Sequence, residues 1–154
     1  MAAMVVLAAS LLVFRSLGAL GVKALASWKE ATRYALAVMF AFTASAHFTG
    51  MRHELVRMVP AGVPYPGAIV AFTGVCELLG AVGLLIPRVQ RIAGIGLILF
   101  LVAVFPANVR AAREELTLGG RRATPLALRL PMQVLFIALT WWVTQTRRQG
   151  AAGS

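Results

Sequence analysis

Residues Ala71–Val109, AFTGVCELLGAVGLLIPRVQRIAGIGLILFLVAVFPANV, decide the fold of this chain. They contain most of two apolar runs, residues 67–86 and 92–109, which are joined by a short basic turn of sequence PRVQR. About 20 apolar residues, at about 1.5 Å per residue, cross the hydrocarbon core of a bilayer. This stretch therefore predicts a transmembrane helical hairpin.

The composition of the whole chain agrees with a membrane location. Of the 154 residues, 60% are hydrophobic and 13% are charged, which makes the chain more apolar than an ordinary soluble domain. The formal net charge of +10 does not indicate nucleic acid, because the basic residues lie at the ends of apolar runs, where lipid headgroups are the expected partners. The single cysteine, Cys76, excludes an internal disulfide. We expect one integral membrane domain over residues 1–154.

The expected fold is an all-α four-helix transmembrane bundle with an additional N-terminal transmembrane helix. This gives five spans, at about residues 4–22, 31–50, 67–86, 92–110 and 126–144. The first run lacks the basic start and the cleavage site of a signal peptide, but it contains Arg15. If that run does not cross the membrane, a plain four-helix bundle remains. Arg147 and Arg148 follow the last run, as expected at a membrane interface.

The segment between the second and third runs has a different pattern. Residues 51–59 place apolar side chains at helical spacing against a charged face, which predicts a short helix lying in the membrane interface. Lysine and arginine are equally numerous on the two sides that five spans create, so the positive-inside rule leaves the orientation open.

Glu77 lies near the middle of the third span, at a depth where a charged side chain is costly and usually functional. Counted along its own span, Arg15 lies at a matching depth, roughly 15 Å from the same membrane face. Each charge alone in lipid would be strongly unfavourable, so we expect a buried ion pair between Glu77 and Arg15, or a polar cavity shared by both. The alternative is that Glu77 only caps polar groups between packed helices. Mostly small residues flank it and would let another helix approach, among them Thr73, Gly74, Gly80 and Ala81.

Other polar side chains are expected in the same half of the membrane, and if they point inward they form a cluster with Glu77 and Arg15. They are Thr43, His47, Thr73, Asn108 and Gln133. For His47, a helix-end hydrogen bond and a role in proton transfer or ligand contact are equally supported. For Asn108 and Gln133, hydrogen bonds between helices are favoured. The spacing of histidine and cysteine indicates no metal site, and no motif decides whether the chain is an enzyme.

Three segments resemble the DoxX and DoxX-like membrane proteins. They are SAHF at Ser45–Phe48, CELLGAVGLLIP at Cys76–Pro87 and FPAN at Phe105–Asn108. The resemblance covers about residues 34–144 and implies a small helical bundle in the bacterial inner membrane, with the basic turn of Arg88 and Arg91 on the cytoplasmic side. The founding members are named for subunits of terminal oxidase or thiosulfate:quinone oxidoreductase complexes, and some relatives are linked to redox-stress assemblies. The family has no agreed catalytic residues.

These observations lead us to expect an accessory subunit that supports redox or quinone-linked chemistry, with membrane lipid as a partner and no nucleic acid. Glu77 and His47 would contact a quinone-like ligand or a lipid. Two other functions fit the sequence. One is an assembly factor that binds partner membrane proteins, or further copies of itself, through small-residue helix faces; the other is a small transporter or proton relay that uses Glu77.

Overall fold

The computed structural model describes residues 1–118, 120–122 and 124–145. The predicted interface anchor at Arg147 and Arg148 lies outside these described residues. The all-α prediction is confirmed, apart from one short hairpin of strands. In chain order the elements are α1 (Ala2–Ala19), the 3-10 helix η1 (Lys23–Leu25), α2 (Trp28–Ser45), α3 (Arg52–Met58), α4 (Pro66–Leu85), α5 (Gln90–Ala103), α6 (Phe105–Arg113), β1 (Thr117–Leu118), β2 (Arg121–Arg122) and α7 (Leu126–Thr144).

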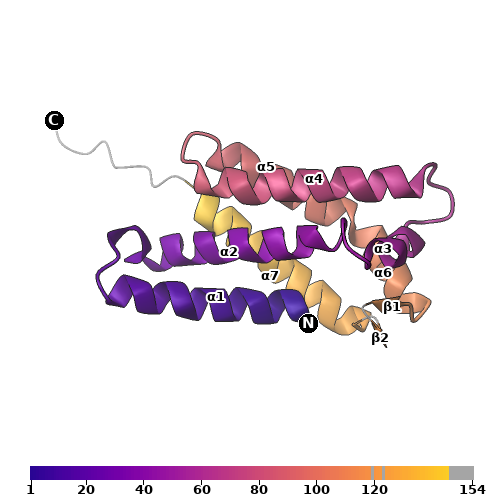
Figure 1. Ribbon diagram of the computed structural model, residues 1–154, viewed down its shortest axis with the longest axis horizontal. Coiled ribbons are helices and arrows are strands. Elements are labelled where there is room, and N and C mark those ends of the chain that lie inside the picture. The colour runs from indigo at the N-terminus through magenta and orange to yellow at the C-terminus, as the bar shows by residue number, and fades with distance from the viewer. Residues whose placement is uncertain (119, 123, 146–154) are drawn as a thin grey trace.

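The long helices form a bundle whose axis follows the longest dimension of the molecule (Figure 1). Helix α2 packs between α1 and α4, α5 packs on α4, and α7 crosses obliquely against α2 and α5 (Figure 1). Helices α3 and α6 and the antiparallel strands β1 and β2 gather at one end, which we call the α3 end (Figure 1). The α1–α2 and α4–α5 connections lie at the other end, which we call the η1 end (Figure 1).

Local sequence signals set the ends of these helices. Helix α2 starts after Ser27, whose hydroxyl accepts a hydrogen bond of 3.1 Å from the backbone N–H of Glu30. Helix α4 begins with Pro66, whose missing N–H costs nothing in a first helical turn. Helices α5 and α6 are separated at Val104, two residues before Pro106, which has no backbone N–H to donate to the preceding turn.

Four helical segments of the described chain are long and apolar enough to cross a membrane. They are α1, α4, the continuous segment Gln90–Arg113 formed by α5 and α6, and α7. This indicates an integral membrane protein. The predicted second span, α2, is long enough at 18 residues but not apolar enough to be one of these segments, because its first turns contain Lys29, Glu30 and Arg33. The short helix expected at residues 51–59 occurs as α3.

The core of the bundle lies around α2. Its largest fully buried side chains include Leu36, Met39 and Phe40 on α2, Leu84 on α4 and Leu97 on α5. Glycines allow these helices to approach closely. A Cβ atom added at Gly80 would lie 2.6 Å from Leu97, and one added at Gly83 would lie 2.6 Å from Ala93. Close backbone packing of this kind stabilises helix contacts in lipid, where the hydrophobic effect between helices is weak.

Candidate functional site

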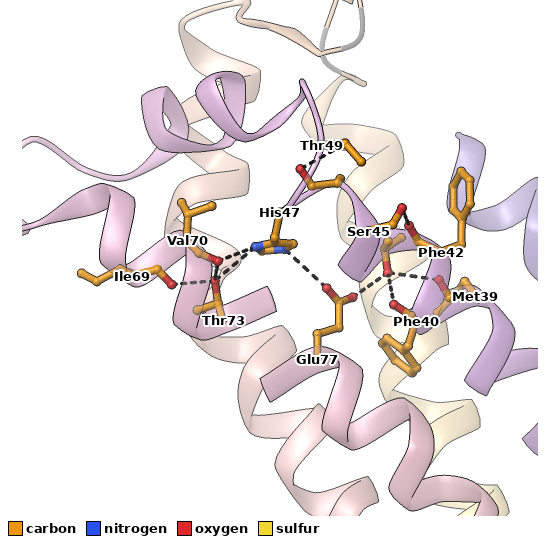
Figure 2. A network of polar contacts seen from close by, with 12 residues as sticks. Met39, Phe40, Phe42, Ser45, His47, Thr49, Ile69, Val70, Thr73 and Glu77 are labelled. Carbon is orange, nitrogen blue, oxygen red and sulfur yellow. Dashed lines mark hydrogen bonds and ion pairs between the residues drawn. The ribbon is translucent and has the colours of Figure 1, made fainter. Parts of the chain in front are cut away.

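Glu77 lies midway along α4 and is only 4% exposed. Two side chains from the end of α2 and the segment after it hold its carboxyl group. The Thr43 hydroxyl donates to Oε1 at 2.5 Å. Nε2 of His47 lies 3.4 Å from Oε2, as Figure 2 shows for His47 and Glu77. The acid is therefore buried and paired inside the protein, as its cost in a membrane requires.

The imidazole of His47 is fixed from its other side as well. Its Nδ1 lies 2.7 Å from the backbone carbonyl oxygen of Val70 and 3.4 Å from the Thr73 hydroxyl (Figure 2). The Thr73 hydroxyl is itself close to the carbonyls of Ile69, at 2.9 Å, and Val70, at 3.0 Å. His47 thus bridges the first turns of α4 to the carboxyl group in the middle of the same helix.

These contacts define where the protons of the pair lie. A backbone carbonyl can only accept, so Nδ1 of His47 carries a hydrogen and donates it to Val70. Nε2 of His47 then faces Oε2 of Glu77 at 3.4 Å, and a proton on this nitrogen makes the contact an ion pair. An imidazolium beside a carboxylate has no net charge. This neutrality lowers the cost of burying them.

Gly74 makes this arrangement sterically possible. A Cβ atom at this position would lie 2.5 Å from Cβ and 2.8 Å from Cγ of His47. Carbon atoms in ordinary contact are about 3.5–4.0 Å apart, so a larger residue would exclude His47 from its present place. The small residues beside Glu77 were expected to let another helix approach. At Gly80 that helix is α5, through Leu97, whereas at Gly74 the segment after α2 approaches, with His47.

The predicted ion pair between Arg15 and Glu77 is wrong. Nη1 of Arg15 donates to the carbonyls of Ala26, at 2.8 Å, and Leu25, at 3.3 Å, and its guanidinium stacks on Trp28 at 4.6 Å from the ring centroid. Trp28 begins α2, whereas Thr43, beside Glu77, lies near its other end. At 1.5 Å per residue these positions are about 22 Å apart. The chain folds back through η1 directly after α1, so Arg15 reaches the backbone of that connection instead.

Asn108 and Gln133 form hydrogen bonds between helices, as favoured from the sequence. The Asn108 side-chain oxygen accepts from Nη1 of Arg129 at 2.7 Å, joining α6 to α7. The Gln133 amide donates to the carbonyl of Leu101 at 2.8 Å, joining α7 to α5. The structure therefore assembles only part of the predicted cluster around the acid, namely Glu77, His47, Thr43 and Thr73.

A second polar network lies at the η1 end and is not predicted by the sequence analysis. Nη1 of Arg33 donates to Oε1 of Gln90 at 2.7 Å, and Nε2 of Gln90 donates to the carbonyl of Val143 at 2.8 Å. Arg33 also forms an ion pair with Glu30, one turn earlier in α2. The network joins α2, α5 and α7. The three-residue spacing of Glu30 and Arg33 on a helix is the local signal that could have revealed it.

Within the described ranges, no three histidine, cysteine, aspartate or glutamate side chains come together as a metal site would need. A model of one protein family matches residues 36–144, and that family is described as a domain of unknown function, DUF8561. The matched range contains His47 and Glu77 and excludes α1, where Arg15 lies. No curated protein and no solved structure matches the chain.

Proposed function

We propose that this chain, which belongs to the DUF8561 family, is an accessory protein of a redox or quinone-linked membrane system and binds the polar head of a quinone or a lipid at the His47–Glu77 pair. The observation that carries the proposal is the Glu77 carboxyl group, buried midway along an apolar helix and held by His47 and Thr43. Ionisable groups at such depth in membrane helices mostly serve function rather than packing.

The chemistry of the pair suits a ligand of this class. Because one proton is shared between Nε2 of His47 and Glu77, the pair can donate a hydrogen bond from either residue and accept one at the other. A quinone carbonyl needs a donor, and a quinol hydroxyl also needs an acceptor. The apolar helices around the pair would suit an isoprenoid or acyl tail, and a few placed polar groups in an apolar surrounding are typical of small-molecule sites.

The resemblance to DoxX-like proteins supports the accessory role. Two of the resembling segments, Ser45–Phe48 and Cys76–Pro87, contain His47 and Glu77. The resemblance also favours the bacterial inner membrane, with the α4–α5 turn and the C-terminus on the cytoplasmic side. A partner protein or a second copy of this chain remains a prediction, which copurification at a fixed stoichiometry would support.

We infer that α2 is a fifth span. Its charged residues Lys29, Glu30 and Arg33 lie in its first turns, at the depth expected for headgroups. Farther along, its buried side chains face α1, α4 and α7 rather than lipid. A helix that neighbouring helices cover on several sides needs less apolar surface than one that faces lipid all round. Helix α3 would then lie in the interface at the opposite face.

Mass spectrometry of lipids and quinones retained after mild detergent extraction tests the proposal. Wild-type protein should retain a quinone or one enriched lipid. Glu77→Gln removes a hydrogen bond to a charged group, a loss of about 1.5–3 kcal/mol or roughly a 10- to 150-fold loss of affinity, so retention should fall accordingly. Glu114→Gln is the matched control, because that acid is exposed and pairs with Arg110. Equal retention in all three proteins would contradict the proposal.

A small transporter that uses Glu77 as its proton site is the second candidate, and the single shared proton favours it. Proton uptake by proteoliposomes that depends on an added solute, and is absent in Glu77→Gln, would support this function. A transporter would not require the copurified ligand that the leading proposal requires, so the two measurements separate the candidates.

A further inference from the structure

We propose that the His47–Glu77 pair communicates with only one side of the membrane, through the α3 end of the bundle, and that a dry apolar layer seals it from the η1 end. This inference rests on the proposed function, because access to the pair matters only if a proton or a ligand reaches it. The inference specifies the side from which a proton or a ligand head reaches the pair. It also means that, without a ligand, protons do not cross the membrane through the protein.

The sealing layer consists of side chains on the η1 side of Glu77. On α4, Ala81 is 2% exposed and Leu84 is fully buried, and across from them Met39 and Phe40 of α2 are each 1% exposed. Leu97 of α5 fills the space at Gly80, one turn from Glu77. These residues belong to one continuous apolar cluster with side chains of α1 and α7. From Glu77 to the end of α4 the layer is about 12 Å thick.

Few polar groups interrupt this layer. Among the described residues, the buried polar side chains on the η1 side of the pair are Thr32, Thr140 and Thr144. The Thr144 hydroxyl donates to the carbonyl of Thr140 at 2.8 Å, and the buried Thr140 hydroxyl has no hydrogen-bond partner in the described part of the chain. A proton path needs a continuous chain of hydrogen-bonding groups or bound waters, and isolated threonines do not supply one.

The charged groups of the packed helices lie beyond this layer. Arg15 of α1 binds carbonyls of the α1–α2 connection, and Arg33 of α2 binds Gln90 of α5. Cys76 is the neighbour of Glu77 in α4, but consecutive helical residues point about 100° apart, so it leads toward a different face. The contacts of Glu77 itself are with His47 and Thr43.

The α3 side of the pair is different. The His47 side chain is 13% exposed, against 5% for Glu77, so His47 is the more accessible member of the pair. Helix α2 ends at Ser45, and the residues after His47, from Phe48 to Gly50, are exposed. Thr49 lies on the far side of His47 from Glu77, and Thr73 and the Val70 carbonyl add polar groups there (Figure 2). The α3 side of His47 is therefore polar and exposed, whereas its η1 side is apolar and buried.

Thiol labelling in liposomes of phosphatidylcholine and phosphatidylglycerol tests this asymmetry. In a Cys76→Ala background, Thr49→Cys and Lys23→Cys mark the α3 and η1 sides, because both positions are exposed. The probe is a charged, impermeant methanethiosulfonate. His47→Cys should lose its free thiol when the probe is on the side that labels Thr49→Cys, whereas Leu84→Cys should keep its thiol with the probe on either side.

Labelling of Leu84→Cys from the Lys23 side would overturn the seal, and failure of His47→Cys to react from the Thr49 side would overturn the opening. If His47→Cys does not fold, Thr73→Cys serves in its place. The wild-type protein provides a further measurement: under an imposed pH gradient its proteoliposomes should leak protons no faster than protein-free ones, and a faster leak would refute the inference. Thiol labelling and proton leak are measured without a ligand. Their outcome therefore tests one-sided access separately from the ligand binding that the retention experiment tests.

Discussion

Replacing Gly74 by alanine should separate His47 from Glu77 without changing either residue. The new methyl group would lie 2.5 Å from Cβ and 2.8 Å from Cγ of His47, and 3.0 Å from Cζ of Phe48. Since carbon contacts settle at about 3.5–4.0 Å, His47 has to retreat by roughly 1 Å. Its Cβ is attached directly to the backbone and cannot swing aside, so the segment after α2 must move with it.

The magnitude follows from these contacts. A retreat of that size lengthens the 2.7 Å hydrogen bond to Val70 and the 3.4 Å contact with Glu77 beyond hydrogen-bonding range. Overpacking a close contact costs about 1–3 kcal/mol. Alanine in place of glycine in a helix gains about 1 kcal/mol. Gly96→Ala on α5 is the matched control. Outside its own helix, no atom of residues 1–118, 120–122 and 124–145 lies within 4 Å of the added Cβ, so only the gain applies.

Unfolding in lipid–detergent micelles, followed by circular dichroism, gives the comparison. Gly74→Ala should be less stable than Gly96→Ala by about 1–3 kcal/mol, the cost of overpacking that only Gly74 carries. Its ligand retention should also fall toward that of Glu77→Gln. If the two glycine variants unfold alike and retain the same ligand, Gly74 does not position His47 and the description of the site is wrong.

Three further substitutions test separate contacts by the same unfolding measurement. His47→Gln and Glu77→Gln should each destabilise by about 1–3 kcal/mol, and the double variant should lose less than their sum; strict additivity would show that the residues do not interact. Arg15→Ala should lower the free energy of unfolding by about 1–3 kcal/mol, because its hydrogen bonds to backbone carbonyls are lost, and ligand retention should not change. A loss of retention would instead support a direct contact between Arg15 and Glu77. Gln90→Leu should lower the free energy of unfolding by a similar amount. An unchanged free energy of unfolding would show that the hydrogen bonds of Gln90 at the η1 end do not stabilise the bundle.

The helices were predictable because their signals are local. The apolar run at residues 67–86 corresponds closely to α4, Pro66–Leu85, and the run at 126–144 coincides with α7, since length and apolarity decide both. The importance of Glu77 was predictable for the same reason: an acid in the middle of an apolar helix needs partners wherever the neighbouring helices lie.

The partner of Glu77 was not predictable by counting depth along each helix. That method assumes that neighbouring helices start at one level, whereas the stagger between them is set by side-chain contacts such as Gly74 against His47. Arg15 therefore has its partners at the η1 end, and His47, expected nearer the membrane surface, meets the acid just beyond the end of α2. Spacing along one helix carries no information about this register.

A buried ion pair between His47 and Glu77 requires that the two residues share one proton inside the bundle. Solid-state NMR of protein labelled with ¹⁵N-histidine and ¹³C-glutamate, in a His53→Gln background that leaves His47 as the one histidine, measures this directly. We expect a dipolar coupling between Nε2 of His47 and the Glu77 carboxyl carbon that fits a 3.4 Å nitrogen–oxygen separation, together with a protonated Nδ1. Absence of that coupling, or an unprotonated Nδ1, would contradict this pairing.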